Sequence, residues 1–302
     1  DLHLCDRRQR QMCIRDRLAN LIISLTKCVA CGNRVQALFD IKSSQEVTSD
    51  KDVIGNADYA VEFRGVSLKY KNAGEDSLTG MDFAVKRGET VGIIGGTGSG
   101  KSSLVNMIPR FYDATAGEVL IGGRDVKSFE IPELRERIGI VPQKAVLFKG
   151  SIRDNMRWGK DDATDDEILA AAKTAQAADV IESKGGLDFE IEQGGKNLSG
   201  GQRQRFTIAR ALVRKPEILI LDDSASALDF ATDAALRKSI REMDTNPTVF
   251  IVSQRTSSIQ HADKIIVLDD GKIAGIGKHD ELLNNCPVYS EIYNSQFKKE
   301  AV

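Results

Sequence analysis

The run GGTGSGKS, from Gly95 to Ser102, constrains this chain more than any other feature of its sequence. It fits the pattern G-x-x-x-x-G-K-[ST] and lies between an apolar stretch, VGIIG, and a helix-forming segment that begins SSLVNM. Glycines let the backbone turn so that several N–H groups converge on phosphate oxygens at the start of a helix. In this pattern Lys101 contacts the β- and γ-phosphates, and the hydroxyl of Ser102 binds Mg²⁺. The alternative, a glycine-rich turn without a ligand, fits the strand-turn-helix context less well.

Strand-like and helix-like segments alternate after residue 59. The predicted strands are Ala60–Tyr70, Met81–Gly95, Ile218–Asp222, Thr248–Ser253 and Lys264–Gly277. Helical patterns cover Asp165–Ser183 and Gln202–Arg214, and Pro216 follows the second. The short aliphatic run ILILD is typical of a strand that is buried on both faces of a parallel sheet. The alternation predicts an α/β domain.

Two further segments carry phosphate or metal chemistry. Asp222 ends an aliphatic strand, where a carboxylate that organises Mg²⁺ is expected, and Asp223 follows it beyond the strand tip. In LSGGQ, Ser199 and the N–H groups of Gly200 and Gly201 form a second anion-binding helix start. By itself LSGGQ is equally consistent with an ordinary serine N-cap. Together with the first glycine-rich run, these segments predict a nucleoside-triphosphate site.

The first 58 residues follow a different pattern. Residues 1–17 show no helical or strand periodicity, and we interpret them as a disordered basic arm or a non-native segment, because MCIRDR resembles a translated sequencing adaptor. A long amphipathic helix reaching about residue 42 is predicted from apolar residues at helical spacing, namely Leu18, Leu21, Ile22, Leu25 and Val29. Residues 43–58 are polar and predict a linker.

Composition narrows the possible classes of protein. With 302 residues, 41% of them hydrophobic and 28% charged, the chain is long enough for a globular domain with a subdomain. The net charge of −2 leaves no basic field for nucleic acid, so we expect no nucleic-acid partner. Residues 32–285 hold no cysteine, which suits a reducing cytosol. No apolar run approaches the roughly 20 residues that cross a bilayer, and the start at Asp1 suggests a piece of a longer product.

GGTGSGKS, LSGGQ and ILILDD, in this order, resemble the nucleotide-binding domain of an ATP-binding cassette (ABC) transporter from about residue 59 to the C-terminus. The resemblance implies an α/β fold: a P-loop NTPase core with a mainly parallel sheet, an antiparallel β subdomain and an inserted helical subdomain at about residues 130–215, preceded by a long helix. It also implies ATP and Mg²⁺ as ligands. Tyr70 would stack on adenine, and the other implied ATP-binding residues are Gly95, Gly96, Thr97, Gly98, Ser99, Gly100, Lys101, Ser102, Ser103, Ser199, Gly200, Gly201 and Gln202. Mg²⁺ would be held by Ser102, Asp222 and Gln143.

The resemblance also implies partners. Two such domains would close head to tail, each ATP lying between the phosphate loop of one and the LSGGQ of the other, with residues 226–229 (SALD) crossing the interface. Residues 18–42 resemble the cytoplasmic end of an exporter's last transmembrane helix. We therefore expect a missing transmembrane domain, a second half-transporter as partner, and a location at the cytoplasmic face of the plasma (inner) membrane.

Two positions depart from the family pattern. The family's general base is a glutamate, and here it is Asp223, one methylene shorter. A displacement of about 1 Å from the attacking water can cost on the order of 100-fold in rate. Gln254 stands where the family has a histidine that contacts the γ-phosphate, and an amide cannot carry the positive charge of an imidazole. The implied catalytic positions are thus Asp223, Gln254 and Gln143, and slow hydrolysis is expected.

These departures favour the degenerate-site subunit of a heterodimeric, multidrug-type exporter. Such a subunit binds Mg-ATP, hydrolyses it weakly at its own site, and completes the partner's hydrolytic site through LSGGQ. Two alternatives stay open: a non-hydrolysing, nucleotide-gated regulatory module, and a homodimeric exporter that uses aspartate as its base. ATP affinity and turnover, measured on the same protein, separate these readings.

Overall fold

The computed structural model describes residues 2–41, 45, 47–48 and 54–297, and it divides the chain into two units, residues 1–46 and residues 47–302. The predicted linker falls partly on residues 42–44, 46 and 49–53, which lie outside the described residues. Residues 47–48 and 54–58 of this linker belong to the second unit. The backbone N–H of Thr48 donates to the carbonyl oxygen of Lys127 at 2.9 Å, and those of Ile54 and Gly55 donate to that of Gly123 at 2.9 Å. The second unit therefore begins before the predicted boundary at residue 59.

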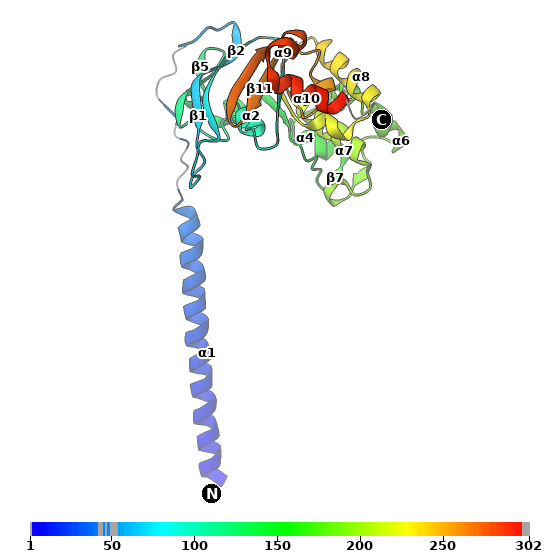
Figure 1. The fold of residues 1–302 in the computed structure, drawn as a ribbon. Coiled ribbons are helices and arrows are strands. Elements are labelled where there is room, and N and C mark those ends of the chain that lie inside the picture. The colour runs from blue at the N-terminus through cyan, green and yellow to red at the C-terminus, as the bar shows by residue number, and fades with distance from the viewer. Residues whose placement is uncertain (1, 42–44, 46, 49–53, 298–302) are drawn as a thin grey trace. The chain divides into compact units, whose positions relative to one another are not determined.

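The described part of the first unit forms the long helix α1, from Leu2 to Phe39 (Figure 1). The predicted helix is confirmed from Leu18 to Phe39, but disorder over residues 2–17 was a wrong expectation. This segment holds no glycine or proline and is rich in arginine, glutamine and leucine, which are good helix formers, so it needs no apolar stripe to be helical. Its non-native origin stays a prediction. None of the described helices combines the length and the apolar stretch that crossing a bilayer requires.

The second unit is built on a six-stranded sheet in the order β12-β11-β3-β10-β9-β6. All neighbours in it pair in parallel except β12, which is antiparallel to β11. The strands are β3 (Thr90–Gly95), β6 (Ile138–Val141), β9 (Ile218–Asp222), β10 (Thr248–Val252), β11 (Lys264–Asp269) and β12 (Lys272–Gly277). The predicted strand at Lys264–Gly277 is therefore a hairpin, and Met81–Gly95 covers parts of two strands.

An antiparallel sheet in the order β2-β1-β4-β5 completes the mixed α/β fold that the sequence predicts. Its strands are β1 (Tyr59–Leu68), β2 (Leu78–Lys86), β4 (Ala116–Ile121) and β5 (Arg124–Asp125), and a separate small ladder joins β7 (Gly150–Ser151) to β8 (Glu190–Ile191). The side chains of β3 contribute to the hydrophobic cores on both faces of the parallel sheet. Ile93 packs with the residues of the antiparallel sheet, while its neighbour Ile94 packs with the helices on the other face. Both faces of β3 are buried, as expected for a central parallel strand.

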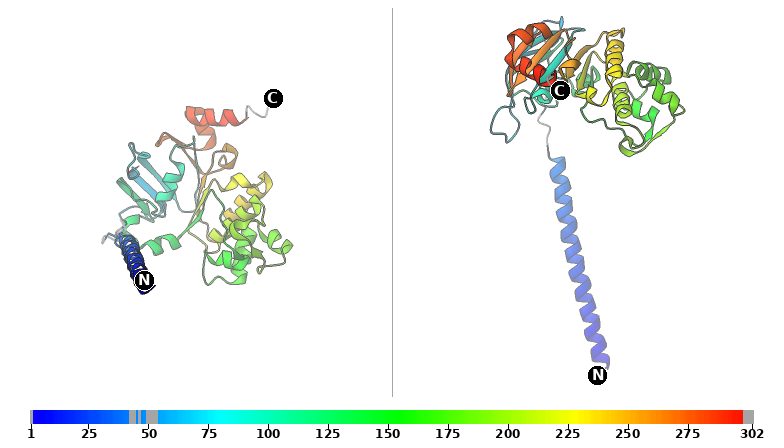
Figure 2. Two further views of the ribbon diagram at one scale, coloured as in Figure 1. Left: turned by 90° about the horizontal axis from the view of Figure 1, so that it is seen from below. Right: turned by 45° about the vertical axis from the view of Figure 1, so that its right-hand side comes forward.

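The helices of the second unit surround the parallel sheet. They are α2 (Lys101–Met107), α3 (Ile131–Glu136), α4 (Ile152–Arg157), α5 (Asp165–Thr174), α6 (Ala178–Ser183), α7 (Gly200–Leu212), α8 (Phe230–Arg241), α9 (His279–Asn285) and α10 (Pro287–Phe297), with short 3₁₀ turns η1 (Val126–Ser128), η2 (Gln193–Gly195), η3 (Ser224–Ala227) and η4 (Thr256–Ser258). Figure 2 shows α9 and α10, in red, beside the orange hairpin of β11 and β12, with which they are in contact.

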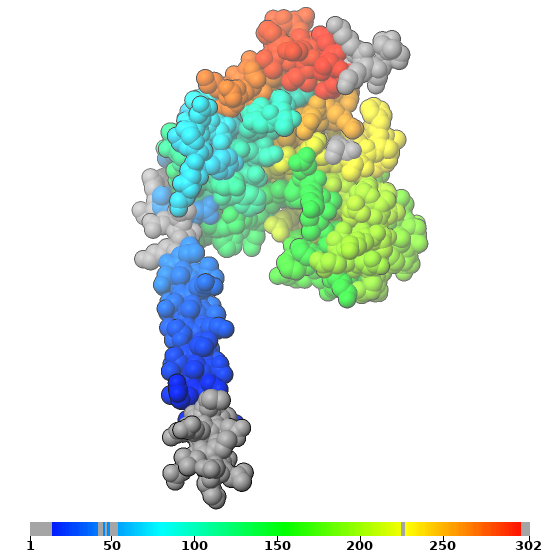
Figure 3. Space-filling model, turned by 60° about the horizontal axis from the view of Figure 1, so that its bottom comes forward, coloured from blue at the N-terminus to red at the C-terminus, as the bar shows by residue number. Residues whose placement is uncertain are grey.

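The helical insertion starts later than predicted. β6 pairs with β9 through Ile138 and Val141, so residues 138–141 belong to the core sheet and the insertion follows them. Strand β6, whose sequence is IGIV, was not predicted from the sequence. The predicted helix at Asp165–Ser183 is two helices, because Gln176 adopts a left-handed φ of 56° between α5 and α6. In Figure 3 the insertion forms a separate lobe in green and yellow-green.

Candidate functional site

Three adjacent strand ends bring together residues that are far apart in the sequence. β3 lies next to β10, and β10 next to β9, all in parallel. Parallel strands share one carboxyl edge, and ligands of open α/β sheets bind outside that edge. The loop from Gly95 to Gly100, the Asp222–Asp223 pair and Gln254 follow or end these three strands. The topology therefore places the predicted phosphate, metal and catalytic residues at one edge of the sheet.

The glycines of the phosphate loop have different roles. Gly98 and Gly100 adopt left-handed φ values of 82° and 93°, which favour glycine. A Cβ at Gly95 would overlap the carbonyl oxygen of Leu268 and approach Ser99 Oγ within 2.5 Å, so no larger residue fits there. A Cβ at Gly98 would meet no protein atom within 4 Å. The loop thus packs tightly against β11 at its start and presents open backbone to the pocket further on.

Lys101 begins α2 and folds back over this loop. Its Nζ donates to the carbonyl oxygens of Gly95 at 2.9 Å and Gly96 at 2.6 Å. Burial lowers the pKa of Lys101, and the negative charges of Asp222 and Asp223 oppose that shift. The lysine is therefore held at the loop as a point charge, where a terminal phosphate would replace its carbonyl partners.

Ser102 and Asp222 form the part of the site that suits a cation. The hydroxyl of Ser102 donates to Oδ1 of Asp222 at 3.3 Å. Burial raises the pKa of Asp222 and the neighbouring Asp223 adds to the rise, whereas Ser102 and Lys101 oppose it. Among the described residues no cluster of three His, Cys, Asp or Glu side chains could hold a metal. The hydroxyl and carboxylate oxygens fit Mg²⁺, which would take its remaining ligands from phosphate and water.

Asp223 lies beside Gln143 at the mouth of the pocket. The Nε2 of Gln143, which follows β6, donates to Oδ2 of Asp223 at 3.2 Å. The backbone of Asp223 is left-handed, with φ of 45°, and its N–H donates to the carbonyl oxygen of Val252 at 2.9 Å. This bond ties the residue after β9 to the end of β10. The position of the carboxylate is therefore fixed by the backbone and by Gln143.

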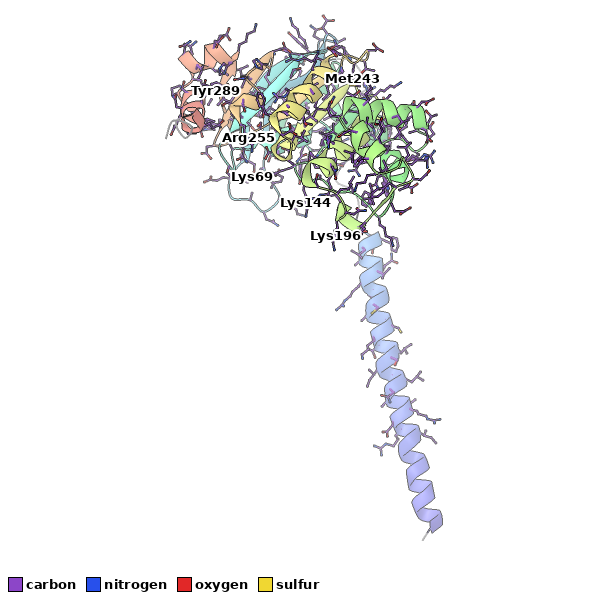
Figure 4. All side chains as sticks on the ribbon, turned by 90° about the vertical axis from the view of Figure 1, so that its right-hand side faces the viewer. Lys69, Lys144, Lys196, Met243, Arg255 and Tyr289 are labelled. Carbon is purple, nitrogen blue, oxygen red and sulfur yellow. The ribbon has the colours of Figure 1, made fainter. Side chains whose placement is uncertain are left out.

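Tyr70 also lines this pocket. Its hydroxyl donates to Ser103 Oγ at 2.8 Å, and its ring meets that of Tyr112 edge-on, with centroids 4.9 Å apart. The pocket has a volume of about 620 Å³. The predicted residues that line it are Tyr70, Thr97, Gly98, Gly100, Lys101, Ser102, Ser103, Gln143, Asp222, Asp223 and Gln254. Figure 4 labels Lys69 and Lys144, the neighbours of Tyr70 and Gln143 in the chain.

Gly95, Gly96 and Ser99 belong to the loop but not to the pocket lining, and the LSGGQ residues lie outside this pocket altogether. Ser199 is the N-cap of α7: its Oγ accepts from the N–H of Gln202 at 3.2 Å, and its own N–H donates to Oε1 of Gln202 at 3.0 Å. Ser199 and Gly200 are exposed. The serine cap is therefore present, and a phosphate role for LSGGQ stays a prediction that requires another chain.

Several pocket residues were missed in the sequence. They are Glu75, Asp76, Ser77, Val252, Ser253, Asp270 and Gly271. The turn between β11 and β12 was detectable, because Asp-Gly between apolar runs indicates a hairpin; Asp270 and Gly271 have left-handed φ values of 43° and 69°. The N–H of Thr79 donates to the carbonyl oxygen of Gly271 at 2.8 Å, which brings this turn to the start of β2. That contact has no local signal in the sequence.

Comparisons with known proteins agree with this site. The family model described as ABC transporter matches residues 78–226. The chain is 40% identical over 281 residues to the uncharacterized ABC transporter ATP-binding protein YfiB of Bacillus subtilis, covering 93% of this chain and 48% of that protein. It is 38% identical over 281 residues to an ATP-dependent lipid A-core flippase of Desulfotalea psychrophila, covering 93% and 49%. The chain thus spans about half the length of the curated relatives it matches.

A solved structure extends the comparison to three dimensions. The structure of a bacterial Atm1-family ABC exporter with ATP bound is 34% identical, with a TM-score of 0.83 over 92% of this chain and 48% of that one. The chain belongs to the ABC transporter family, and its P-loop domain is similar to the ATP-binding domains of ABC exporters.

Proposed function

We propose that this chain is the ATP-binding part of an ABC exporter subunit whose own site binds Mg-ATP firmly and hydrolyses it slowly. One observation carries the proposal. Lys101, Ser102 and Asp222 line the pocket as a competent phosphate and Mg²⁺ site requires, but Asp223 and Gln254 occupy its catalytic positions. Bound Mg²⁺ would neutralise phosphate charge, while Lys101 and the loop N–H groups orient the triphosphate. Binding and hydrolysis are therefore separable in this chain.

The second part of the proposal concerns the partner. Ser199 and Gly200 at the start of α7 are exposed and lie outside the chain's own pocket, so this helix start is free to face a nucleotide bound elsewhere. We place there the ATP of a second, hydrolytically competent half-transporter, which makes the assembly a heterodimer. The homodimeric alternative, with Asp223 as base, and the non-hydrolysing regulatory module are outcomes of the test below.

A groove between the core and the helical insertion supports coupling to a transmembrane domain. It has a volume of about 240 Å³ and is lined by Phe111, Arg135, Trp158 and Arg210 among others. Trp158 is 65% exposed and stacks on Phe148 with ring centroids 4.8 Å apart. Exposed aromatic residues at a groove are typical anchors for a partner segment. We assign the groove to the chain's own membrane-embedded half, and we propose that the domain lies at the cytoplasmic face of the plasma (inner) membrane.

The test measures binding and turnover on the same purified chain. Mg-ATP affinity is measured by displacement of a fluorescent ATP analogue, and turnover by phosphate release, for the wild type and for the double variant Asp223→Glu with Gln254→His. We expect turnover to rise on the order of 10- to 100-fold, because the longer carboxylate reaches the attacking water. ATP affinity should change far less than turnover, since Lys101 and Ser102 are unchanged and a histidine at position 254 still offers an N–H donor to the γ-phosphate.

A matched control carries the same chemical changes away from the pocket: Asp244→Glu with Gln36→His, both at exposed positions. This variant should behave like the wild type. Unchanged turnover in the Asp223→Glu, Gln254→His variant, with ATP still bound, would contradict a degenerate hydrolytic site and favour the regulatory module. Brisk turnover by the wild type would favour the homodimeric exporter.

A further inference from the structure

The side chain of Gln296, near the end of α10, is hydrogen-bonded to the loop that follows β10. Its Nε2 donates to the carbonyl oxygen of Gln254 at 2.7 Å. Its Oε1 accepts from the N–H of Thr256 at 2.9 Å and from the Thr256 hydroxyl at 3.0 Å. One amide group thus spans the backbone from residue 254 to residue 256, although it lies 40 positions further along the chain.

The loop is fixed on both sides of Gln254. Before it, the N–H of Ser253 donates to the carbonyl oxygen of Ile93 at 3.0 Å, and Ser253 Oγ accepts from the N–H of Arg255 at 2.9 Å. After it, Thr256 is fully buried at the start of η4. Gln254 itself is exposed in the nucleotide pocket. The Gln296 amide therefore contributes to the backbone position from which the Gln254 side chain enters the pocket.

The chemistry of this contact requires an amide. The carbonyl of Gln254 needs a donor and the N–H of Thr256 needs an acceptor, and a planar amide presents both. A leucine at position 296 would offer neither, and a glutamate would offer acceptors alone. Gln296 does not line the pocket, so it cannot contact the nucleotide directly.

Helix α10 packs against the core, and this packing holds the backbone of Gln296 in place. Tyr289 is fully buried, and its hydroxyl lies 2.7 Å from Nδ1 of His279. The helix contacts β3, β11 and η4. β3 also leads into the phosphate loop, so α10 contacts both the strand before that loop and the η4 turn after Gln254. Figure 4 labels Arg255 in the loop after β10 and Tyr289 on α10.

We propose that Gln296 is a positioning residue, which sets the backbone of residues 254–256 so that Gln254 faces the terminal phosphate of a bound nucleotide. The inference rests on the proposed function, because it assigns Gln254 to the γ-phosphate. It adds that a residue of the C-terminal helix determines how well the site distinguishes a triphosphate from a diphosphate. A residue that merely stabilised the fold would affect the two nucleotides equally.

The experiment measures the affinities of the full chain for ADP and for AMP-PNP, a non-hydrolysable ATP analogue, both with Mg²⁺. The variants are Gln296→Leu, Gln254→Ala and the combination of the two. The preference for AMP-PNP over ADP should fall about tenfold or more in each single variant, the value of one hydrogen bond to a charged group. The double variant should show no further loss, because both changes remove the same contact.

Two more variants separate positioning from stability. Gln296→Glu keeps the acceptor for Thr256 but places an acceptor against the carbonyl of Gln254, so it should lose nucleotide preference while retaining more thermal stability than Gln296→Leu. Asn294→Leu, at an exposed site on the same helix, is the matched control and should change neither property.

Equal weakening of ADP and AMP-PNP, additive losses in the double variant, or an unchanged preference in Gln296→Glu would each overturn the proposal. These readouts depend on binding alone. The proposed function is judged by the gain in turnover of Asp223→Glu with Gln254→His, so the failure of either idea is recognised without the other.

Discussion

Gln143 and Asp223 are joined by a hydrogen bond of 3.2 Å, in which the amide of Gln143 donates to the carboxylate. The two residues lie 80 positions apart and meet because β6 and β9 are paired immediately before them. Each side chain continues from a strand end that the sheet fixes. The length of the side chain at position 223 therefore decides how far its carboxylate extends into the pocket.

Neutralising this carboxylate should have little effect if the site is already slow. We expect Asp223→Asn to change the turnover of the purified chain by less than about threefold, because a carboxylate misplaced by one methylene contributes little as a base. Phosphate release under single-turnover conditions measures this. Complete loss of turnover in Asp223→Asn would instead identify Asp223 as the working base of a homodimer.

Lys101 and Ser199 should affect different properties. Lys101→Ala should weaken ATP binding by the chain alone more than about tenfold, since it removes a charged donor to phosphate. Ser199→Ala should leave that affinity unchanged, because Ser199 lies outside the pocket. It should cost about 1 kcal/mol of stability as a lost helix cap. Ser151→Ala, which removes the equivalent capping box of α4, is the matched control for the stability loss. Equal binding defects in Lys101→Ala and Ser199→Ala would contradict this division.

Asp222 should destabilise the nucleotide-free chain. Its pKa is raised, chiefly by burial, so the native state favours the protonated form and loses stability as the pH rises through that pKa. Asp222→Asn should therefore raise the free energy of unfolding at pH 7, by an amount that solvent screening of this partly exposed carboxylate reduces, with no gain once the pH falls below the ordinary pKa of about 3.9. Urea unfolding in EDTA at both pH values measures this, and Asp244→Asn is the exposed control.

The same Asp222→Asn variant should lose the dependence of ATP affinity on Mg²⁺, because it removes a carboxylate ligand. A variant that is less stable than the wild type at pH 7 would show that the contacts of the Asp222 carboxylate outweigh the cost of its burial. A variant that still responds to Mg²⁺ would show that Asp222 is not required to bind the metal.

Two neighbouring glycines should respond differently to alanine. A Cβ at Gly95 would meet the backbone of Leu268 and the hydroxyl of Ser99, whereas one at Gly96 would meet no atom within 4 Å. Gly95→Ala should therefore cost roughly 1–3 kcal/mol of stability from overpacking and should weaken ATP binding as the loop shifts. Gly96→Ala should be tolerated. Thermal unfolding and ATP titration of the pair measure both effects, and equal behaviour of the two variants would count against the close packing of the loop on β11.

Tyr70 was implied by the family resemblance alone, whereas the phosphate loop and the Asp222–Asp223 pair could be predicted because each follows or ends a recognisable strand. Local spacing fixes these features, so a single sequence contains enough information. The insertion boundary at Val141 was less accessible, since β6 is only four residues long and becomes a strand by pairing with β9. The helix over residues 2–17 was missed because hydrophobic periodicity was the signal sought, and this polar segment has none.

Other parts of the site depend on contacts between distant segments. The turn at Asp270–Gly271 could be recognised as a turn, but its place beside Thr79 follows from the packing of one hairpin on another segment. Gln296 gives no signal at all in the sequence. It lies in an amphipathic helix among ordinary polar residues, and its three hydrogen bonds exist only once α10 has packed against η4.

The placement of the chemistry at the ends of three neighbouring parallel strands has an evolutionary consequence. The strands themselves are apolar and almost wholly enclosed, while the reacting groups stand just past their tips. Replacing a side chain just past a strand end removes no core packing. A substitution there can therefore abolish one step of a reaction while the fold and ligand binding are retained. A duplicated gene with this architecture can therefore exchange catalysis for control through one or two substitutions.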